Sequence, residues 1–147
     1  MAELKLEKIR ISEILEYENN PRNNDKAIEP VMNSIRKFGY VSPIIVDEEG
    51  VILAGHTRIK ALREMGVEEV EVIRLKGLTD QEKKSYRIAD NRTAEFSSWD
   101  GNLLEVEMRE ISADDWQKFG FKDAEVRRFK PNNFCTCPKC GQTFVKV

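Results

Sequence analysis

Residues 43–58 read Pro-Ile-Ile-Val-Asp-Glu-Glu-Gly-Val-Ile-Leu-Ala-Gly-His-Thr-Arg. Two apolar runs, 43–46 and 51–54, flank an acidic turn that contains a glycine, which predicts a β-hairpin. Gly55 interrupts the second strand, and residues 57–65 then place apolar side chains at helical spacing. The stretch therefore predicts a hairpin that runs directly into a helix.

The segments on either side supply more strands and helices. Upstream, residues 5–11 alternate apolar and charged side chains and predict a half-buried strand. A helix that ends at Gly39 follows, with one apolar face formed by Ile28, Val31, Met32, Ile35 and Phe38. Downstream, residues 70–75 predict another strand, and the Thr79–Glu82 capping box opens a helix towards Asn91.

These elements predict an α+β protein in which helices pack on a small mixed β-sheet. Short helices between residues 99 and 129 and a cysteine-rich tail follow. We divide the chain into a core domain (1–95), a helical extension (96–130) and the tail (131–147).

Composition limits the function classes. The 147 residues are 40% apolar and carry a formal net charge of −2, which suits one modest folded core. Any contact with nucleic acid must come from a local basic patch, because the chain as a whole is not basic. Apolar runs are too short to span a membrane and the N-terminus lacks a signal-peptide core, so the expected location is the cytoplasm, with no membrane partner.

The junction at Gly55 is a candidate anion site. Free amides at a helix N-terminus favour negative charge, and Thr57 and Arg58 add a hydroxyl and a guanidinium suited to phosphate. His56, the only histidine, can bind a phosphate or act as an acid or base near neutral pH. A tight turn with an exposed histidine and a surface arginine is the alternative.

A second polar cluster, Asp90-Asn91-Arg92, lies at the predicted helix end. The aspartate can hold Mg²⁺, and the asparagine and arginine can hold phosphates. The alternative is an ordinary C-terminal turn with an arginine near the negative end of the helix dipole.

Four boxes in order resemble the N-terminal domain of ParB-type proteins, over residues 5–129. They are Asn20-Pro21-Arg22, residues 34–39 (Ser-Ile-Arg-Lys-Phe-Gly), residues 43–46 (Pro-Ile-Ile-Val) and residues 55–61 (Gly-His-Thr-Arg-Ile-Lys-Ala). Residues 89–92 and Trp99-Asp100 resemble a subgroup found in phages and beside, or fused to, DNA methyltransferases.

The resemblance implies a ParB/sulfiredoxin-like fold, shared with free-serine kinases, and a pocket for CTP or ATP with Mg²⁺. Gly55 and Arg58 match the Gly-x-x-Arg of the phosphate-binding box. Asp90 and Asn91 match the Glu-Asn of a second box, and Arg22 matches the Asn-Pro-Arg box near the pocket. With His56, Thr57 and Arg92, these are the expected nucleotide-binding residues.

The sequence also departs from the family pattern. His56-Thr57 replaces a Glu-Arg pair whose glutamate is tied to nucleotide hydrolysis, and the catalytic cysteine of sulfiredoxin would fall at His56, so sulfiredoxin chemistry is excluded. Catalysis stays open, as an NTPase, phosphotransferase or nuclease with His56 or Asp90 as acid–base. A following helix-turn-helix domain is not expected, and neither is a centromere clamp.

The tail contains a Cys-Pro-x-Cys-Gly knuckle, Cys137 to Gly141, that is typical of zinc ligands, and Cys135 precedes it by two residues, so Cys135, Cys137 and Cys140 are the expected ligands. The fourth ligand is left open among His56, a carboxylate, water and a cysteine of a second subunit, and we favour sharing across a homodimer. Free thiols are the alternative. Basic residues near this end suit nucleic acid, although a solvated charged end explains them equally well.

Three functions follow from these features. The first is a nucleotide-binding regulatory or accessory protein of phage-type DNA metabolism or modification, with DNA and a DNA methyltransferase as partners. The second is a nuclease or an ATP-dependent small-molecule kinase. The third is a DNA-binding adaptor that uses the zinc tail while the pocket is vestigial.

Overall fold

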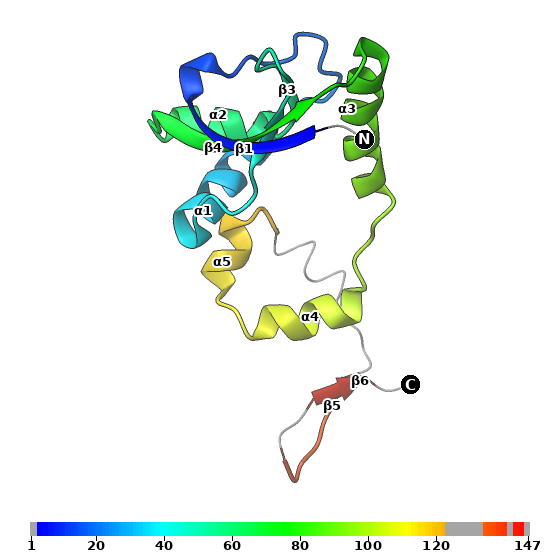
Figure 1. The fold of residues 1–147 in the computed structure, drawn as a ribbon. Helices are drawn as coiled ribbons and strands as arrows, with labels where there is room; N and C mark the ends of the chain where they lie inside the picture. Colours follow the sequence, from blue (N-terminus) through cyan, green and yellow to red (C-terminus); the bar gives the residue numbers. More distant parts are fainter. Residues whose placement is uncertain (1–2, 123–133, 141–142, 146–147) are drawn as a thin grey trace. The chain divides into compact units, whose positions relative to one another are not determined.

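The computed structural model describes residues 3–122, 134–140 and 143–145 (Figure 1). The chain divides into two compact units, residues 1–97 and 98–147, and each is described by itself. The three-part division expected from the sequence stays a prediction. The first unit contains, in order, β1 (Glu3–Arg10), the 3₁₀ turns Ile11–Glu13 and Asp25–Ala27, α1 (Ile28–Phe38), β2 (Ile44–Val46), β3 (Ile52–Ala54), α2 (His56–Glu64), β4 (Glu69–Lys76) and α3 (Asp80–Glu95).

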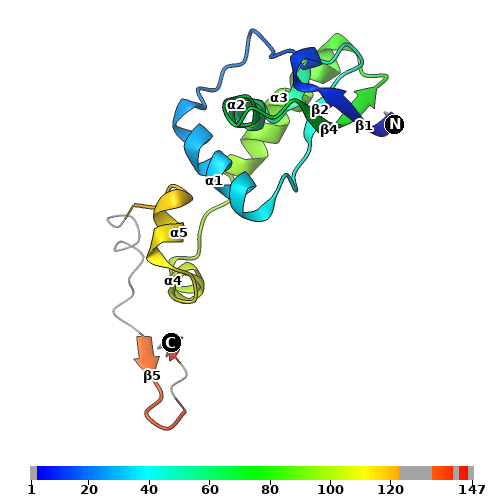
Figure 2. The ribbon, with the colours of Figure 1, turned by 90° about the vertical axis from the view of Figure 1, so that its left-hand side faces the viewer.

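A four-stranded mixed sheet in the order β1-β4-β2-β3 organises the first unit. β4 pairs antiparallel with β1 and parallel with β2, and β2 and β3 form the predicted antiparallel hairpin. The helix predicted after this hairpin is α2, which packs beside α1 (Figure 2). The predicted α+β class is therefore confirmed.

The core of the first unit lies around the hairpin and α2. The side chains that are almost fully buried are branched and aliphatic, and their burial is the main favourable contribution to folding. They come from the turn after β1, from β2, β3 and β4, and from α2: Ile14, Ile44, Val46, Ile52, Ile59, Leu62 and Val72.

One sequence prediction about burial is wrong, and another holds only in part. Phe38 was expected on the buried face of α1, but it is 56% exposed in the last turn of the helix, with Lys37 above its ring. The segment predicted as a half-buried strand packs Ile9 against the core and buries Ile11 just after β1, but Leu6 is exposed in β1, which forms an edge of the sheet. Amphipathic spacing thus identified both elements but not the depth of their burial.

The end of α3 also differs from the prediction. The helix opens at the Thr79–Glu82 capping box as expected, but it continues to Glu95. Asp90, Asn91 and Arg92 therefore do not lie at the helix end. They lie about one turn before it, within the regular hydrogen-bonded helix.

The second unit contains α4 (Gly101–Arg109) and α5 (Ala113–Lys118), which meet through a small core of Leu104, Met108, Trp116 and Phe121. Both lie in the region where short helices were predicted, whereas residues 123–130 of that region lie outside the described residues. A short antiparallel hairpin, β5 (Phe134–Thr136) with β6 (Thr143–Val145), was not predicted. None of the helices described here has the length and apolar character needed to cross a membrane.

Candidate functional site

Gly55 makes the turn between β3 and α2. Its φ of +107° lies in the left-handed region, and α2 begins at the next residue, so the turn needs glycine. A Cβ at this position would lie 3.1 Å from the Ile44 side chain and 3.3 Å from the Arg58 guanidinium. The first amides of α2 have no acceptor within the helix, so this junction presents the positive end of a helix dipole.

A cavity of about 430 Å³ opens at this junction, all of it within the first unit. It is closed on other sides by α1, by the loops before and after α1, and by α3. Residues predicted from separate parts of the sequence meet here. Seven of the predicted site residues line it: Arg22, Gly55, His56, Thr57, Arg58, Asp90 and Asn91.

Arg92 does not line this cavity. It follows Asn91 on α3 and lies against Glu95 and the Phe96 ring, where it lines a neighbouring hollow instead. Each residue of a helix is turned by about 100° from the one before it, so Arg92 lies about 200° around α3 from Asp90 and faces away from the cavity that Asp90 and Asn91 line. The three-residue cluster read from the sequence is therefore divided between two surfaces.

Arg58 holds the loop before β2 against the start of α2. Its Nη1 donates to the carbonyl oxygens of Ser42 and Pro43, each at 2.6 Å, and lies 3.0 Å from the Ser42 hydroxyl. All these contacts use one nitrogen of the guanidinium. Arg58 is thus both a wall of the cavity and a structural tie, which was not foreseen from the sequence.

Arg22 and Asn91 meet across the cavity although 69 positions separate them. Arg22 Nη1 donates to Asn91 Oδ1 at 2.8 Å, and Asn91 Nδ2 donates to the carbonyl oxygen of Arg87 at 2.8 Å. Both ends of the asparagine amide are therefore engaged. Asn91 positions Arg22 at the edge of the cavity.

His56 is buried at the first position of α2. Its Nε2 has no hydrogen-bond partner among the described residues. Burial lowers the pKa of His56 below its usual range, Glu16 opposes this shift, and the positive charges of Arg87 and Lys60 add to it. The imidazole is therefore neutral at pH 7 and offers an unused ring nitrogen.

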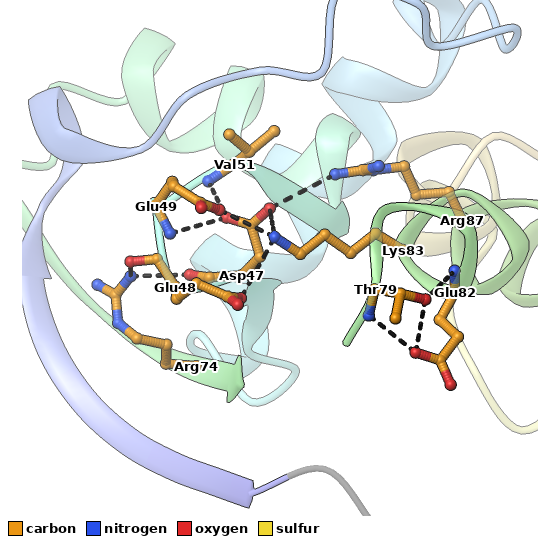
Figure 3. A network of polar contacts seen from close by, with 9 residues as sticks. All are labelled: Asp47, Glu48, Glu49, Val51, Arg74, Thr79, Glu82, Lys83 and Arg87. Carbon is orange, nitrogen blue, oxygen red and sulfur yellow. Dashed lines mark hydrogen bonds and ion pairs between the residues drawn. The ribbon is translucent and has the colours of Figure 1, made fainter. Parts of the chain in front are cut away.

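A buried ionic network fastens α3 to the β2–β3 turn (Figure 3). Lys83 reaches from α3 to the carboxylate of Glu49 at 2.9 Å and to those of Asp47 and Glu48 at 3.4 Å each. Burial alone would lower the pKa of Lys83, but the carboxylates of Glu49, Asp47 and Glu48 outweigh it and raise the pKa. Lys83 is therefore a fixed positive charge that holds the helix in place.

Arg87 extends this network towards the cavity. Its Nη2 lies 3.9 Å from Asp47 Oδ2, its Nε donates to the carbonyl oxygen of Ile52 at 2.8 Å, and its guanidinium lies 3.9 Å from the centre of the Tyr17 ring. Because the carbonyl of Arg87 accepts from Asn91, the network sets the position of the cavity wall. The sequence offered no signal for it, since residues 47–49 read only as a turn.

The residues present fit a magnesium nucleotide better than a bare metal. Asp90 places one carboxylate at the cavity, whereas the Oδ1 of Asn91 already accepts from Arg22. Within the described part of the chain, no group of three or more His, Cys, Asp or Glu side chains forms a metal-binding cluster. Mg²⁺ commonly takes one or two carboxylates together with phosphate oxygens and water, which this donor set can supply when a polyphosphate is bound.

In the second unit, the turn after β5 arranges two cysteines as in a metal knuckle. The backbone amides of Lys139 and Cys140 and the Cys140 thiol donate to Cys137, and they lower the pKa of its thiol. Amides aimed at one sulfur favour the thiolate, which is the form that binds zinc. The side chain of Cys135 lies outside the described residues.

With this geometry established, the chain can be compared with known proteins. The family model described as the ParB N-terminal domain matches residues 1–92. This chain belongs to the ParB N-terminal domain family. The matched segment contains the whole cavity, from Asn20 to Asn91, so the resemblance noted in the sequence is confirmed for the family. The phage-associated subgroup and the zinc tail stay predictions.

Two relatives are similar in sequence. The ParB-like nuclease domain-containing protein YnaK of Escherichia coli K12 is 36% identical over 75 residues, which cover 50% of this chain and 86% of YnaK. A probable chromosome-partitioning protein ParB of Campylobacter jejuni is 33% identical over 67 residues, which cover 42% of this chain but only 24% of that protein.

A solved structure shares the fold. The C-terminally truncated chromosome-partitioning protein ParB of Caulobacter crescentus, in complex with CTP-γ-S, aligns with a TM-score of 0.65 at 21% identity. The alignment covers 85% of this chain and 76% of that one. The ParB N-terminal domain fold is therefore shown for this chain.

Several cavity residues were missed at the sequence level. Ser42 and Tyr40 precede β2, and the Ile44 amide donates to the Tyr40 hydroxyl at 2.6 Å. Ser34 contributes from α1. The available signal was that Ser34 opens the family box at 34–39 and that Tyr40 and Ser42 lie between this box and the one at 43–46, since none of these residue types stands out alone.

Proposed function

We propose that this chain is a regulatory nucleotide-binding module whose cavity takes the triphosphate of CTP or ATP together with Mg²⁺. One observation carries the proposal: residues from four separate segments converge with the N-terminus of α2 on a single cavity of about 430 Å³. This volume lies within the range of about 300–1,000 Å³ typical of small-molecule sites. The ParB relative of similar fold was solved with CTP-γ-S, which supports a nucleotide as the ligand.

The roles of the cavity residues follow from their chemistry. The α2 amides, Thr57 and Arg58 bind phosphate oxygens, and Arg22 faces the same charge from the opposite wall. Asp90 supports Mg²⁺ when the nucleotide is present. His56 lines the same cavity, and Asn91 keeps Arg22 in position.

Thermal unfolding with CTP, ATP, GTP and UTP, each with and without Mg²⁺, tests the proposal. A nucleotide at 100 times its Kd should stabilise the chain by about 2.7 kcal/mol. Thr57→Val and Arg58→Ala should reduce the nucleotide-induced shift, whereas Arg63→Ala, on the same helix but outside the cavity, should retain it. The induced shift is compared, and not Tm itself, because Arg58 also supports the Ser42–Pro43 loop. If no triphosphate raises Tm, the cavity is not a nucleotide site.

We place this module in phage-type DNA metabolism or modification, where it contacts DNA and works beside a DNA methyltransferase as a homodimer. The family membership and the chromosome-partitioning relative support a DNA-associated role. Gel-shift assays at two salt concentrations, with and without nucleotide, measure the DNA contact, and light scattering measures the dimer. If the chain is a monomer and binds no DNA with or without nucleotide, this proposed role is contradicted.

The enzyme alternative is favoured by one observation, the buried His56 with its free ring nitrogen. As a neutral imidazole, it could take a proton from a bound substrate. Incubation with labelled ATP, serine and plasmid DNA separates a kinase, an NTPase and a nuclease from a binding module. Nucleotide binding without any product would reject the enzyme function.

The zinc-tail alternative is favoured by the amides aimed at Cys137. Metal analysis of purified protein should find zinc, and Cys137→Ser should remove it. A ratio of one zinc per two chains would support a site shared between subunits. If the tail contacts DNA, deletion of residues after Lys130 should abolish DNA binding, while unchanged binding would reject the adaptor function.

A further inference from the structure

A second hollow, of about 410 Å³, lies next to the cavity in the same unit. Arg22 and Asn91 line both spaces, so their hydrogen bond forms a common wall. The rest of the second hollow is built from the loop after the first 3₁₀ turn and from the outer side of α3. We call this hollow the α3 groove; besides the common wall it is lined by Tyr17, Asn19, Pro21, Lys84, Arg87, Ile88, Arg92 and Glu95.

The base of the α3 groove is preformed. The Arg87 guanidinium lies on the Tyr17 ring and is held from behind by Asp47 and by the Ile52 carbonyl. Lys83, one turn before Arg87, anchors the same stretch of helix to the β2–β3 turn (Figure 3). A partner that binds here therefore meets a surface that needs little ordering, which favours association.

The outer side of α3 alternates cations and apolar side chains. Lys84, Ile88, Arg92 and Phe96 follow one another at intervals of four residues, so they share one side of the helix. Ile88 is 62% exposed and Phe96 is 75% exposed, so apolar surface on this side of α3 faces solvent. Four cations, Arg22, Lys84, Arg87 and Arg92, and one carboxylate, Glu95, line the groove beside Ile88.

We propose that the α3 groove is a docking surface for an acidic amphipathic segment of a partner protein. The apolar side chains of such a segment cover Ile88 and Pro21, while its carboxylates face Lys84 and Arg22. This mode is the docking of a helix into a groove through residues spaced by three or four. The chain as a whole is slightly acidic, so the local cations are what select an acidic partner.

A nucleic acid fits the α3 groove less well than such a peptide. Arg87 and Arg92 already pair with Asp47 and Glu95, so fewer cations are available to follow a phosphate backbone. Tyr17 is the aromatic residue of the groove, and one face of its ring is covered by Arg87. Aliphatic Ile88 and Pro21 offer apolar contact but no stacking surface for bases.

A displayed library of random 16-residue peptides, selected on the full chain and counter-selected on Ile88→Asp, tests the proposal. The enriched peptides should carry net negative charge with apolar residues three or four apart. By fluorescence anisotropy, the most enriched peptide should bind at least tenfold more weakly to Ile88→Asp and to Lys84→Glu. Leu6→Asp is the matched control, because Leu6 is 61% exposed but lies on β1, outside the groove, and it should leave the affinity unchanged.

The proposal would be overturned if the selected peptides were basic or purely polar. It would also be overturned if Leu6→Asp lost as much affinity for the peptide as Ile88→Asp, or if counter-selection on Ile88→Asp left no enriched peptide. Displacement of the peptide by single-stranded DNA would assign the groove to nucleic acid, and displacement by excess chain would assign it to self-association. Ile88 and Lys84 do not line the cavity, so their variants should keep any nucleotide-induced thermal shift. A failure here is therefore distinct from a failure of the nucleotide site.

Discussion

Arg22 donates a 2.8 Å hydrogen bond to Asn91, and this contact joins the loop before α1 to the last turns of α3. A double-mutant cycle with Arg22→Ala and Asn91→Ala should give a coupling of about 0.5–1.5 kcal/mol in the free energy of unfolding, as for other single hydrogen bonds. Urea unfolding of the four proteins measures it. Strictly additive effects would mean that the contact is not formed in solution.

The Lys83 network makes a strong prediction about stability. Lys83→Met removes the charge that three carboxylates surround and leaves the buried Asp47 with Arg87 at 3.9 Å as its cation, beside the backbone amides of Glu49 and Val51. Loss of one partner from a buried ion pair costs about 3–5 kcal/mol, and we expect the lower end because Glu48 and Glu49 reach solvent.

The neighbouring variant Lys84→Met is the control for this prediction. Lys84 is exposed on the same helix, so its replacement should change the free energy of unfolding by about 0.5 kcal/mol or less. Urea midpoints of the two variants that agree within error would show that Lys83 is not held as described.

His56 makes stability depend on pH. Because burial lowers its pKa in the folded chain, the unfolded chain binds more protons as the pH falls through the ordinary value of about 6.5. The stabilisation is thus present at neutral pH and is lost on acidification. His56→Gln should lose less free energy of unfolding than the wild type between about pH 7.5 and 5.5. Parallel pH profiles would contradict the assignment of a lowered pKa.

Gly55 can be tested against a glycine of similar conformation. Gly55→Ala adds a Cβ 3.1 Å from Ile44 at a φ of +107°, whereas Gly66→Ala, at a φ of +71°, meets nothing within 4 Å. Both variants carry the backbone cost of alanine at positive φ, roughly 1 kcal/mol or more. Only Gly55→Ala should lose additional stability and displace Arg58. Equal Tm values for the two variants would show that the crowding at Gly55 is relieved without cost.

The sequence predicted local features well because they depend on neighbours in the chain. The β-branched runs beside Gly50 specified the hairpin, and the Thr79–Glu82 box fixed the start of α3. The end of α3 could not be read in the same way, because no glycine or proline follows Asn91 before Gly101. The helix therefore continues to Glu95, and Arg92 lies on the side of α3 that faces the α3 groove.

Burial and long-range pairing were beyond the reach of the sequence. Lys83 and Lys84 are identical neighbours, yet one is buried among carboxylates and the other is exposed, because only the first faces the β2–β3 turn. The cavity residues were predicted as separate groups through motif chemistry and family resemblance. Their convergence, and the partner of Arg22, depend on tertiary packing between segments 69 residues apart.

The wall formed by Arg22 and Asn91 has two sides, and this has a thermodynamic consequence. A ligand that draws Arg22 away from Asn91 on one side alters the surface offered on the other. If a ligand in the cavity changes the affinity of the α3 groove for its partner by some factor, the partner must change the affinity of the cavity for its ligand by the same factor. This reciprocity holds because the two binding equilibria form a closed thermodynamic cycle. The position of the Arg22 guanidinium would then couple the two sites without a hinge and without movement of the sheet.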